Sequence, residues 1–383
     1  MSEVLFREAV TRGNTRMKIA TIETFDLTCP LNRPFGWSQG WIDQRGTTLV
    51  KITTDNGLAG WGEGAESSII NHVLAPLLTG ANPMDRAGLW ERMFHALYNG
   101  NNAVGLAGSA VSALDIALWD LAGKAANLPL YKLLGGARDK IPAYASTPLF
   151  DDVDAYLQNA EEFIAQGFKA IKFHTWCIPQ NDLELARAVR AKYPGDEVAF
   201  MLDAENNYDR DGALRVAQEL EAMGFTWFEA PLHDADLDGY RELTARVSIP
   251  ILPSGNWFQD LASFSHAIHT QAWGRARTDA AMMGGITQTA KAIALTQAAG
   301  MKCEIMSWGY SLVSAANLHL MLAHDNCSYY EQSVPCPPYE YGMKDVIRAQ
   351  PDGYAYAPQG PGLGLEVDWE AMEEATILQF AVE

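Results

Sequence analysis

The chain has 383 residues, of which 48% are hydrophobic and 20% are charged, values that are ordinary for a globular protein with a large buried core. Its formal net charge of −19 argues against nucleic acid or an anionic membrane as a partner, because both repel an acidic surface. Five dispersed cysteines without a CxxC pair favour a reducing, cytoplasmic location, and no apolar run approaches the roughly 18 residues of a membrane span.

The first third of the chain predicts an α+β unit over residues 17–135. Residues 1–16 are polar and mixed in charge, which predicts a flexible N-terminal extension. Residues 17–65 read as antiparallel strands with a hairpin turn at 55–57, and residues 30–45 are predicted to form a long loop between two of the strands. Residues 111–125 are apolar on nearly every face, so we expect a packed helix there.

After residue 135 the pattern changes to short apolar strands separated by helical segments. The strands begin near Ile141, Ala170, Ala199, Thr226, Ile249, Ala276, Lys302 and Cys327. Strands at such regular intervals, each followed by a helix, predict an α/β fold with a (β/α)₈ TIM-like barrel over residues 136–353. An open doubly wound sheet is the alternative, but no glycine-rich phosphate loop follows any of these strands. Residues 354–383 are expected to fold back onto the first unit.

Acidic and amide side chains follow three successive strands of the predicted barrel. Asp203 ends the third strand, Glu229 ends the fourth, and Asn256 follows the fifth. The active site of such a barrel lies at the carboxyl ends of its strands, so we expect these oxygen ligands to meet and to hold Mg²⁺. Side chains alternate along this strand, so we expect Glu205 to point the same way as Asp203. The alternative interpretation is that these side chains are solvated caps of the following helices.

The second strand ends in Lys172 and His174, which are two residues apart and therefore share a face. A lysine beside a divalent metal can bind a carboxylate and help to stabilise an enolate, and a histidine with a pKa near neutral can carry a proton. The alternative for His174 is a surface or core histidine without a chemical role. Its position one strand from Asp203 favours the chemical role.

Four sequence motifs are similar to those of a known enzyme group. They are Gly60-Trp61-Gly62-Glu63, the helical segment 113–124, Leu133-Leu134-Gly135-Gly136 and Gly284-Gly285-Ile286-Thr287. From residue 17 to the C-terminus the chain resembles the enolase superfamily, specifically the branch of mandelate racemase and muconate lactonizing enzyme. The resemblance implies an α+β capping domain over the barrel, a Mg²⁺-bound carboxylate substrate, and abstraction of the proton α to that carboxylate through an enediolate.

The resemblance also implies roles for single residues. The three metal-ligand positions are occupied by Asp203, Glu229 and Asn256, and the Lys-x-Lys motif of strand two by Lys172 and His174. The aspartate of an Asp–His pair on strands six and seven corresponds to Asp279. A strand-eight glutamate that contacts the substrate corresponds to Glu331.

Three positions depart from the family pattern. The third metal ligand is normally acidic and is Asn256 here, whereas Glu205 stands where this branch commonly has asparagine. We hypothesise that Glu205 supports or joins the metal site; pairing with a nearby cation is the alternative. The histidine of strand seven is replaced by Met306, which cannot carry a proton, so the substrate face opposite His174 lacks an obvious base.

A single base favours a particular class of reaction. Racemisation needs an acid and a base on opposite faces of the α-carbon, whereas a syn β-elimination of water can use His174 for both proton transfers. We therefore expect an enzyme that dehydrates an acid sugar, an aldonate or aldarate. A racemase, epimerase or cycloisomerase is the first alternative, and a binding protein that has lost catalysis is the second. We expect Arg33, Trp37, Trp308 and Glu331 to contact the substrate, and the protein to be a homo-oligomer.

Overall fold

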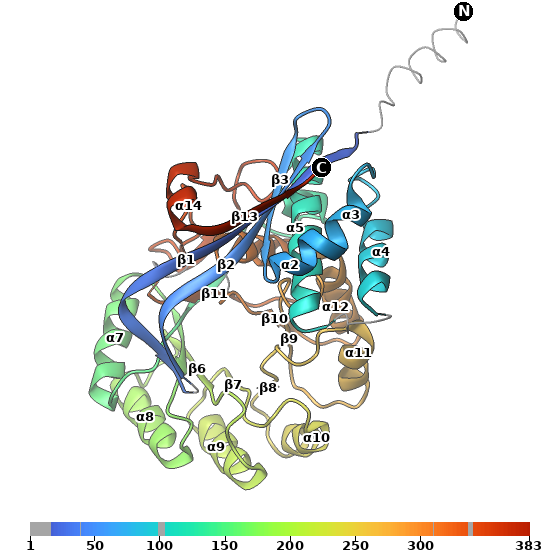
Figure 1. Cartoon of the computed structure of the whole chain (residues 1–383). Helices are drawn as coiled ribbons and strands as arrows, with labels where there is room; N and C mark the ends of the chain where they lie inside the picture. The colour runs from blue at the N-terminus through green and yellow to red at the C-terminus, as the bar shows by residue number, and fades with distance from the viewer. Residues whose placement is uncertain (1–16, 39, 99–103, 309, 336–339) are drawn as a thin grey trace, which may run out of the picture.

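The computed structural model describes residues 17–38, 40–98, 104–308, 310–335 and 340–383. The predicted extension, residues 1–16, lies outside the described part of the chain. Figure 1 shows two units, a twisted sheet with helices built mainly from the N-terminal third and a ring of strands enclosed by helices.

The first unit contains an antiparallel sheet in the order β13-β1-β2-β3. Its strands are β1 (Ile19–Trp37), β2 (Gly40–Thr54), β3 (Ala59–Gly64) and, from the C-terminal tail, β13 (Thr376–Val382). The expected turn at 55–57 joins β2 to β3. The predicted loop at 30–45 is wrong, because β1 and β2 remain paired as far as Trp37 and Gly40. The pairing shifts register between Pro30 and Phe35, and this shift accommodates the prolines. In the sequence, prolines at these positions are typical of a strand end.

The first unit also contains helices, the longest of which packs directly against β2 and β3. They are α2 (Ser67–Ile69), a π-helical segment (Ile70–Leu74), α3 (Ala75–Leu78), α4 (Arg86–Tyr98), α5 (Leu106–Ala126) and α6 (Leu130–Leu133). The packed helix expected at 111–125 is α5. Among the described helices, α5 alone is long and apolar enough to cross a membrane, yet 89% of its apolar window is buried inside the protein. That degree of burial is typical of a core helix.

The second unit is the barrel. Its strands are β4 (Lys140–Ser146), β5 (Ala170–His174), β6 (Ala199–Asp203), β7 (Trp227–Glu229), β8 (Ile251–Leu252), β9 (Ala276–Thr278), β10 (Cys303–Ile305) and β11 (Tyr330–Ser333). Parallel ladders join β11-β4-β5-β6-β7-β8 in that order and join β9 to β10. Each of the eight predicted strands is present, and the predicted fold class is confirmed.

Helices surround the ring of strands on the outside (Figure 1). They are α7 (Val153–Ala165), α8 (Pro179–Lys192), α9 (Arg210–Ala222), α10 (Leu237–Arg246), α11 (Leu261–His269), α12 (Ile286–Ala298) and α13 (Ser311–Ala323). After the barrel, β12 (Tyr354–Tyr356) pairs with β4, and α14 (Trp369–Ala375) leads into β13. The tail therefore returns to the edge of the N-terminal sheet beside β1.

Two buried acids of the first unit tie it to helices of the barrel. Glu63 of β3 accepts hydrogen bonds from the backbone N–H groups of Tyr310 (3.0 Å) and Val313 (2.8 Å) at the start of α13. Asp115 of α5 accepts hydrogen bonds from the Thr287 N–H (2.8 Å) and hydroxyl (2.6 Å) at the start of α12. Carboxylates satisfy the unpaired N–H groups of a helix start and interact well with its dipole, so these contacts hold the two units in register.

The glycines of β3 let this strand pack directly on α5. A Cβ atom on Gly62 would lie 2.0 Å from the Ala113 carbonyl oxygen and 2.8 Å from the Ala117 nitrogen. Because both are backbone atoms, Gly62→Ala is expected to lower the free energy of unfolding by about 3 kcal/mol. Gly88→Ala in α4, where a Cβ meets nothing within 4 Å, should be neutral or slightly stabilising. Urea denaturation of both variants tests this, and equal stabilities would contradict it.

Candidate active site at the carboxyl ends of the barrel strands

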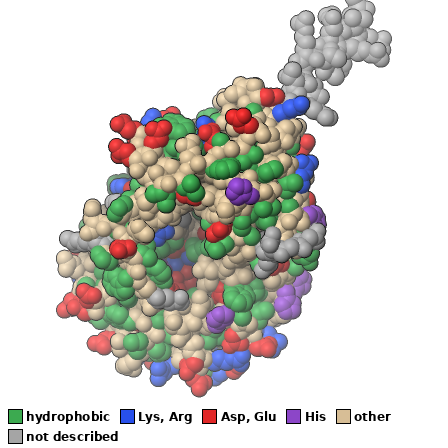
Figure 2. Space-filling view, viewed as in Figure 1, with side chains coloured by type: hydrophobic (Ala, Val, Ile, Leu, Met, Phe, Trp, Pro, Cys, Tyr) green, Lys and Arg blue, Asp and Glu red, His purple; other side chains and the backbone are tan. Residues whose placement is uncertain are grey.

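A cavity of about 350 Å³ opens where the barrel strands end, beneath the β1–β2 hairpin. Figure 2 shows the molecular face hollowed near its centre, with acidic and basic side chains inside the hollow. The cavity is lined by Trp37, Arg45, Lys172, His174, Asp203, Glu205, Asn206, Glu229, Ala230, Ser254, Asn256, Arg277, Met282, Met306, Trp308 and Glu331. Nine of the eleven predicted site residues are in this set, Asp279 is not, and the side chain of Arg33 lies outside the described part of the structure.

Lys172 lies at the centre of the charged floor. Its Nζ is 2.7 Å from Glu229 Oε1, 3.0 Å from Asp203 Oδ2 and 3.0 Å from Glu331 Oε1. The side chain is 1% exposed, so water cannot compensate these charges. Burial lowers the pKa of Lys172, but the Glu229 and Glu331 charges outweigh it and raise the pKa well above the ordinary value. Lys172 is therefore a fixed ammonium ion that binds carboxylates from three different strands.

Asp203 and Glu229 are opposite each other on paired strands, and their carboxyl groups are within hydrogen-bonding reach. Burial, together with the Asp203 charge, raises the pKa of Glu229 to about 8 despite its cationic neighbours. Burial acts the same way on Asp203, but Lys172 and His174 outweigh it and hold the pKa of Asp203 well below its usual range. The raised pKa of Glu229 means that this carboxyl group tends to keep its proton beside Asp203. A cation bound between the two groups would stabilise both of them in the ionised form.

This donor set fits Mg²⁺, provided that the third protein ligand is an amide. Within the described residues, no group of three His, Cys, Asp or Glu side chains could hold a metal ion. Asn256 follows β8 and lines the same cavity, exposed to solvent. Its backbone is held by a hydrogen bond from its N–H to Ser254 Oγ (3.1 Å). Two carboxylates and one amide oxygen would hold Mg²⁺ through the oxygen ligands that this ion prefers.

His174 presents one ring nitrogen to the cavity. Its Nδ1 lies 2.6 Å from the Thr147 carbonyl oxygen, which only accepts, so Nδ1 carries a proton. Its Nε2 lies 3.2 Å from Asp203 Oδ2 and 3.8 Å from Glu205 Oε1. Burial and Lys172 lower the pKa of His174, whereas Asp203 and Glu205 raise it, and the net shift is upward. The Trp308 ring packs against the imidazole with centroids 4.8 Å apart.

Glu205 connects the barrel to the β1–β2 hairpin. Strand β6 ends at Asp203, and Glu205 has a left-handed backbone (φ 45°), so the strand alternation used to place it does not continue. Its carboxylate accepts a hydrogen bond from the hydroxyl of Ser38, close to the hairpin tip. Burial raises the pKa of Glu205, against the lowering effect of His174. Glu205 therefore borders the histidine and the hairpin.

Asp279 and Met306 are the two positions of the altered Asp–His pair. The Asp279 carboxylate accepts hydrogen bonds from the Ala281 N–H (2.6 Å) and from Asn317 Nδ2 (3.1 Å), and it is 3% exposed. Asn317 also donates to the Met306 carbonyl oxygen (2.8 Å). Met306 lines the cavity, whereas Asp279 does not. Burial raises the pKa of Asp279 to about 6.

The substrate-contacting residues predicted from sequence differ in their positions. Trp37 and Trp308 line the cavity, and the Trp308 indole N–H donates to Ser146 Oγ (2.7 Å). Glu331 is fully buried on the floor, bound to Lys172 and to Arg277. Arg33 lies on β1, and its side chain is outside the described part of the structure.

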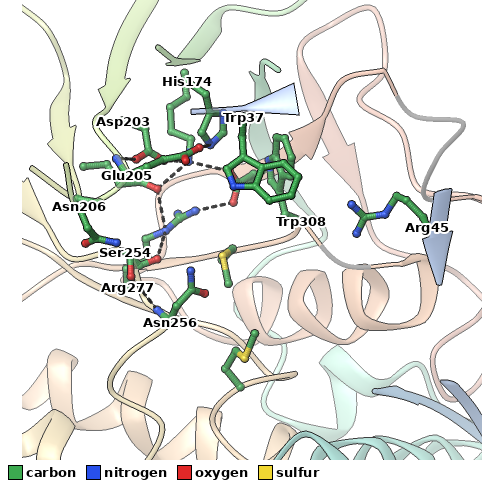
Figure 3. A pocket seen from close by; sticks show the side chains of 16 residues that line it. Trp37, Arg45, His174, Asp203, Glu205, Asn206, Ser254, Asn256, Arg277 and Trp308 are labelled. Carbon is green, nitrogen blue, oxygen red and sulfur yellow. Dashed lines mark hydrogen bonds and ion pairs between the residues drawn. The ribbon is translucent and has the colours of Figure 1, made fainter. Parts of the chain in front are cut away.

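Two arginines of the cavity were not predicted. Arg45 of β2 lies on the far side of Trp308 from Asp203 (Figure 3). Arg277 of β9 donates to Glu331 Oε2 (2.7 Å) and lies 3.0 Å from Glu229 Oε1. The sequence carried a signal for Arg277, because a charged side chain within a buried barrel strand requires a charged partner nearby. Arg45 had no such signal, because residues 30–45 were assigned to a loop.

Both units match the models of known protein families. Residues 19–135 match the family model described as mandelate racemase/muconate lactonizing enzyme, N-terminal domain, and residues 155–371 match the one described as enolase C-terminal domain-like. A proposed mandelate racemase/muconate lactonizing enzyme from Pseudovibrio sp. is 37% identical with a TM-score of 0.89, over 96% of this chain and 100% of that chain.

Two similar proteins have named activities. D-galactarolactone cycloisomerase of Agrobacterium fabrum is 28% identical over 94% of this chain and 98% of its own length. The structure of D-glucarate dehydratase from Agrobacterium tumefaciens complexed with magnesium is 28% identical with a TM-score of 0.83, over 95% of this chain and 100% of that chain. The chain belongs to the mandelate racemase/muconate lactonizing enzyme family of the enolase superfamily.

Proposed function

We propose that this protein is a Mg²⁺-dependent enzyme that removes the proton α to a carboxylate and dehydrates an acid sugar, an aldonate or aldarate. The observation that carries the proposal is that His174 is the one histidine among the described residues that line the cavity. His174 Nε2 lies beside Asp203, and Met306 lines the cavity where the family pattern has a second base. Elimination on one face needs one acid–base group, whereas inversion at the α-carbon needs two.

The proposed metal site consists of Asp203, Glu229 and Asn256, with Glu205 as a supporting acid. When bound there, Mg²⁺ would supply positive charge that stabilises the two oxygens of the enediolate better than the starting carboxylate. Lys172, held within 3.0 Å of all three floor carboxylates, would direct its ammonium charge at the same oxygens. Glu331 would fix Lys172 in place.

His174 would perform both proton transfers. The neutral imidazole accepts the α-proton at Nε2, while Nδ1 keeps its hydrogen bond to the Thr147 carbonyl oxygen. The imidazolium then returns that proton to the β-hydroxyl group, which leaves as water as the Cβ–O bond breaks. The resulting enol tautomerises to a 2-keto-3-deoxy acid. Trp37 and Trp308 would stack on the CH face of the sugar chain, and Arg33 would bind a distal carboxylate.

Asp279 was predicted to be catalytic by analogy with the family. We propose that it acts at a distance from the substrate, because it bonds to the turn after β9 and to Asn317. In that role it would keep β9 and the Met306 carbonyl aligned through their shared Asn317 partner.

The test is incubation of the protein with a library of aldonates, aldarates and their lactones, with MgCl₂ and with EDTA. We expect 2-keto-3-deoxy acids to form from at least one acid sugar and to disappear with EDTA. Solvent deuterium in the α-position without loss of water would instead indicate an epimerase. Ring opening of a lactone without hydrolysis would indicate a cycloisomerase, the activity named for the Agrobacterium fabrum relative. Absence of any turnover would contradict an acid-sugar enzyme and favour a binding protein.

The remaining proposals concern the setting of the enzyme. We propose a capping domain over residues 17–135 with the tail 354–383, a catalytic barrel over 136–353, and a homo-oligomer in the cytoplasm whose partner is a small carboxylate. The net charge of −19 supports the absence of nucleic-acid and membrane partners. Size-exclusion chromatography with light scattering measures the oligomeric state.

A further inference from the structure

Arg277 is the second cation at the bottom of the cavity. Contacts with the surrounding chain fix the position of its side chain. Its side chain is 2% exposed. The Nε atom lies 3.0 Å from Glu229 Oε1 and donates to the Ser254 carbonyl oxygen (3.2 Å). The Nη2 atom donates to Glu331 Oε2 (2.7 Å), and Nη1 is 3.4 Å from the Tyr144 hydroxyl. Four separate strands or strand ends therefore hold one guanidinium group.

The loop that carries the third metal ligand also makes room for this arginine. Gly255 has a φ of 86°, and a Cβ atom there would lie 3.0 Å from the Arg277 Cγ atom. Ser254 on one side of Gly255 accepts the Arg277 N–H, and Asn256 on the other side is the proposed amide ligand. Residues 254–256 therefore position the Arg277 cation and also provide the neutral ligand Asn256. Both features reduce the negative charge on this side of the metal site.

The Glu229 oxygens are already occupied by donors. Oε1 receives Lys172 Nζ (2.7 Å) and faces Arg277 Nε (3.0 Å), and Oε2 accepts the Trp227 indole N–H (3.1 Å). A metal ion that binds Glu229 has to share this carboxylate with a guanidinium group that keeps its charge at every accessible pH. Two positive charges a few ångströms apart repel strongly in a buried site.

We propose that Arg277 is a built-in counter-cation of Glu229 and Glu331 that competes with the divalent ion and sets a low metal affinity for this site. The inference rests on the proposed function, because it takes Asp203 and Glu229 as metal ligands. Arg277 would keep the carboxylates ordered before the metal arrives, and it would weaken metal binding through charge repulsion and through its hold on Glu229.

The experiment is a titration of the purified full-length protein with MgCl₂ by calorimetry and with MnCl₂ by electron paramagnetic resonance, at constant ionic strength. Arg277→Gln is expected to bind both ions at least about tenfold more tightly than the unmodified protein. Arg277→Lys, which keeps the positive charge, should stay close to the unmodified protein. Arg275→Gln is the matched control, because Arg275 directly precedes the same strand but binds Glu304 (2.9 Å), and the metal affinity of this variant should not change.

The variant Arg277→Gln leaves Glu331 without one partner and could lose stability. The double variant Arg277→Gln/Glu331→Gln removes that bare carboxylate and should also bind metal more tightly, with a larger rise of Tm in MgCl₂ than the unmodified protein shows. Equal affinities in the unmodified protein and both folded variants would overturn the role of Arg277 and leave the metal site intact. If none of the proteins binds either ion, the role of Arg277 and the magnesium part of the proposed function both fail.

Discussion

His174→Asn is expected to lower kcat for acid-sugar dehydration by about 10² to 10⁴-fold, the usual contribution of a general acid–base group. An asparagine amide can still donate to the Thr147 carbonyl oxygen, which His174 Nδ1 contacts at 2.6 Å, so the local backbone should keep its position. Exchange of the substrate α-proton with solvent deuterium should be lost together with dehydration, because one imidazole is proposed to carry both protons.

The matched control is His233→Asn. His233 accepts a hydrogen bond from the Ala235 N–H (3.2 Å) and makes an edge-to-face contact with Trp257. It does not line the cavity, so kcat should not change. If dehydration persists in His174→Asn at the unmodified rate, His174 is not the base. If α-proton exchange persists while dehydration is lost, a second group removes the proton and His174 only protonates the leaving hydroxyl.

The barrel and most of its cavity could be predicted because the strand ends follow a local rule. Side chains alternate along a strand, so Lys172 and His174 had to share a face, and parallel strands bring their carboxyl ends together. The structure accordingly places Asp203 opposite Glu229 in neighbouring strands. The hairpin at 30–45 escaped prediction because its pairing tolerates Pro30 through a register shift, which depends on tertiary packing and not on local pattern.

The charge arrangement on the cavity floor could not be predicted from sequence. Arg277 and Glu331 are 54 residues apart, and their ion pair depends on how the barrel brings β9 and β11 together. Glu205 was placed by strand alternation, but the strand ends two residues earlier, and Ser38 of the hairpin sets its contacts instead. The sequence thus indicated which strand ends hold the reactive side chains. Which cation pairs with which carboxylate could be seen only in the folded structure.

Lys172→Met is expected to lower the free energy of unfolding by about 3–5 kcal/mol and to abolish turnover. The ammonium group is within 3.0 Å of three carboxylates whose side chains are at most 6% exposed, so its removal leaves buried negative charges without their shared partner. Lys169→Met is the matched control, because Lys169 is exposed at the opposite end of the same strand, and its effect should stay within about 0.5 kcal/mol. Urea denaturation and the acid-sugar assay measure the two effects.

A double variant separates the structural effect of Lys172 from its chemical effect. In Lys172→Met/Glu331→Gln one of the three carboxylates becomes a neutral amide, so part of the lost stability should return. Turnover should remain absent, because no ammonium group then faces the enediolate oxygens. If turnover returns together with stability, Lys172 serves only to hold the carboxylates. If Lys172→Met alone does not change the stability, Arg277 is sufficient to compensate the negative charges of the buried carboxylates. The charge of Lys172 then acts only on the substrate.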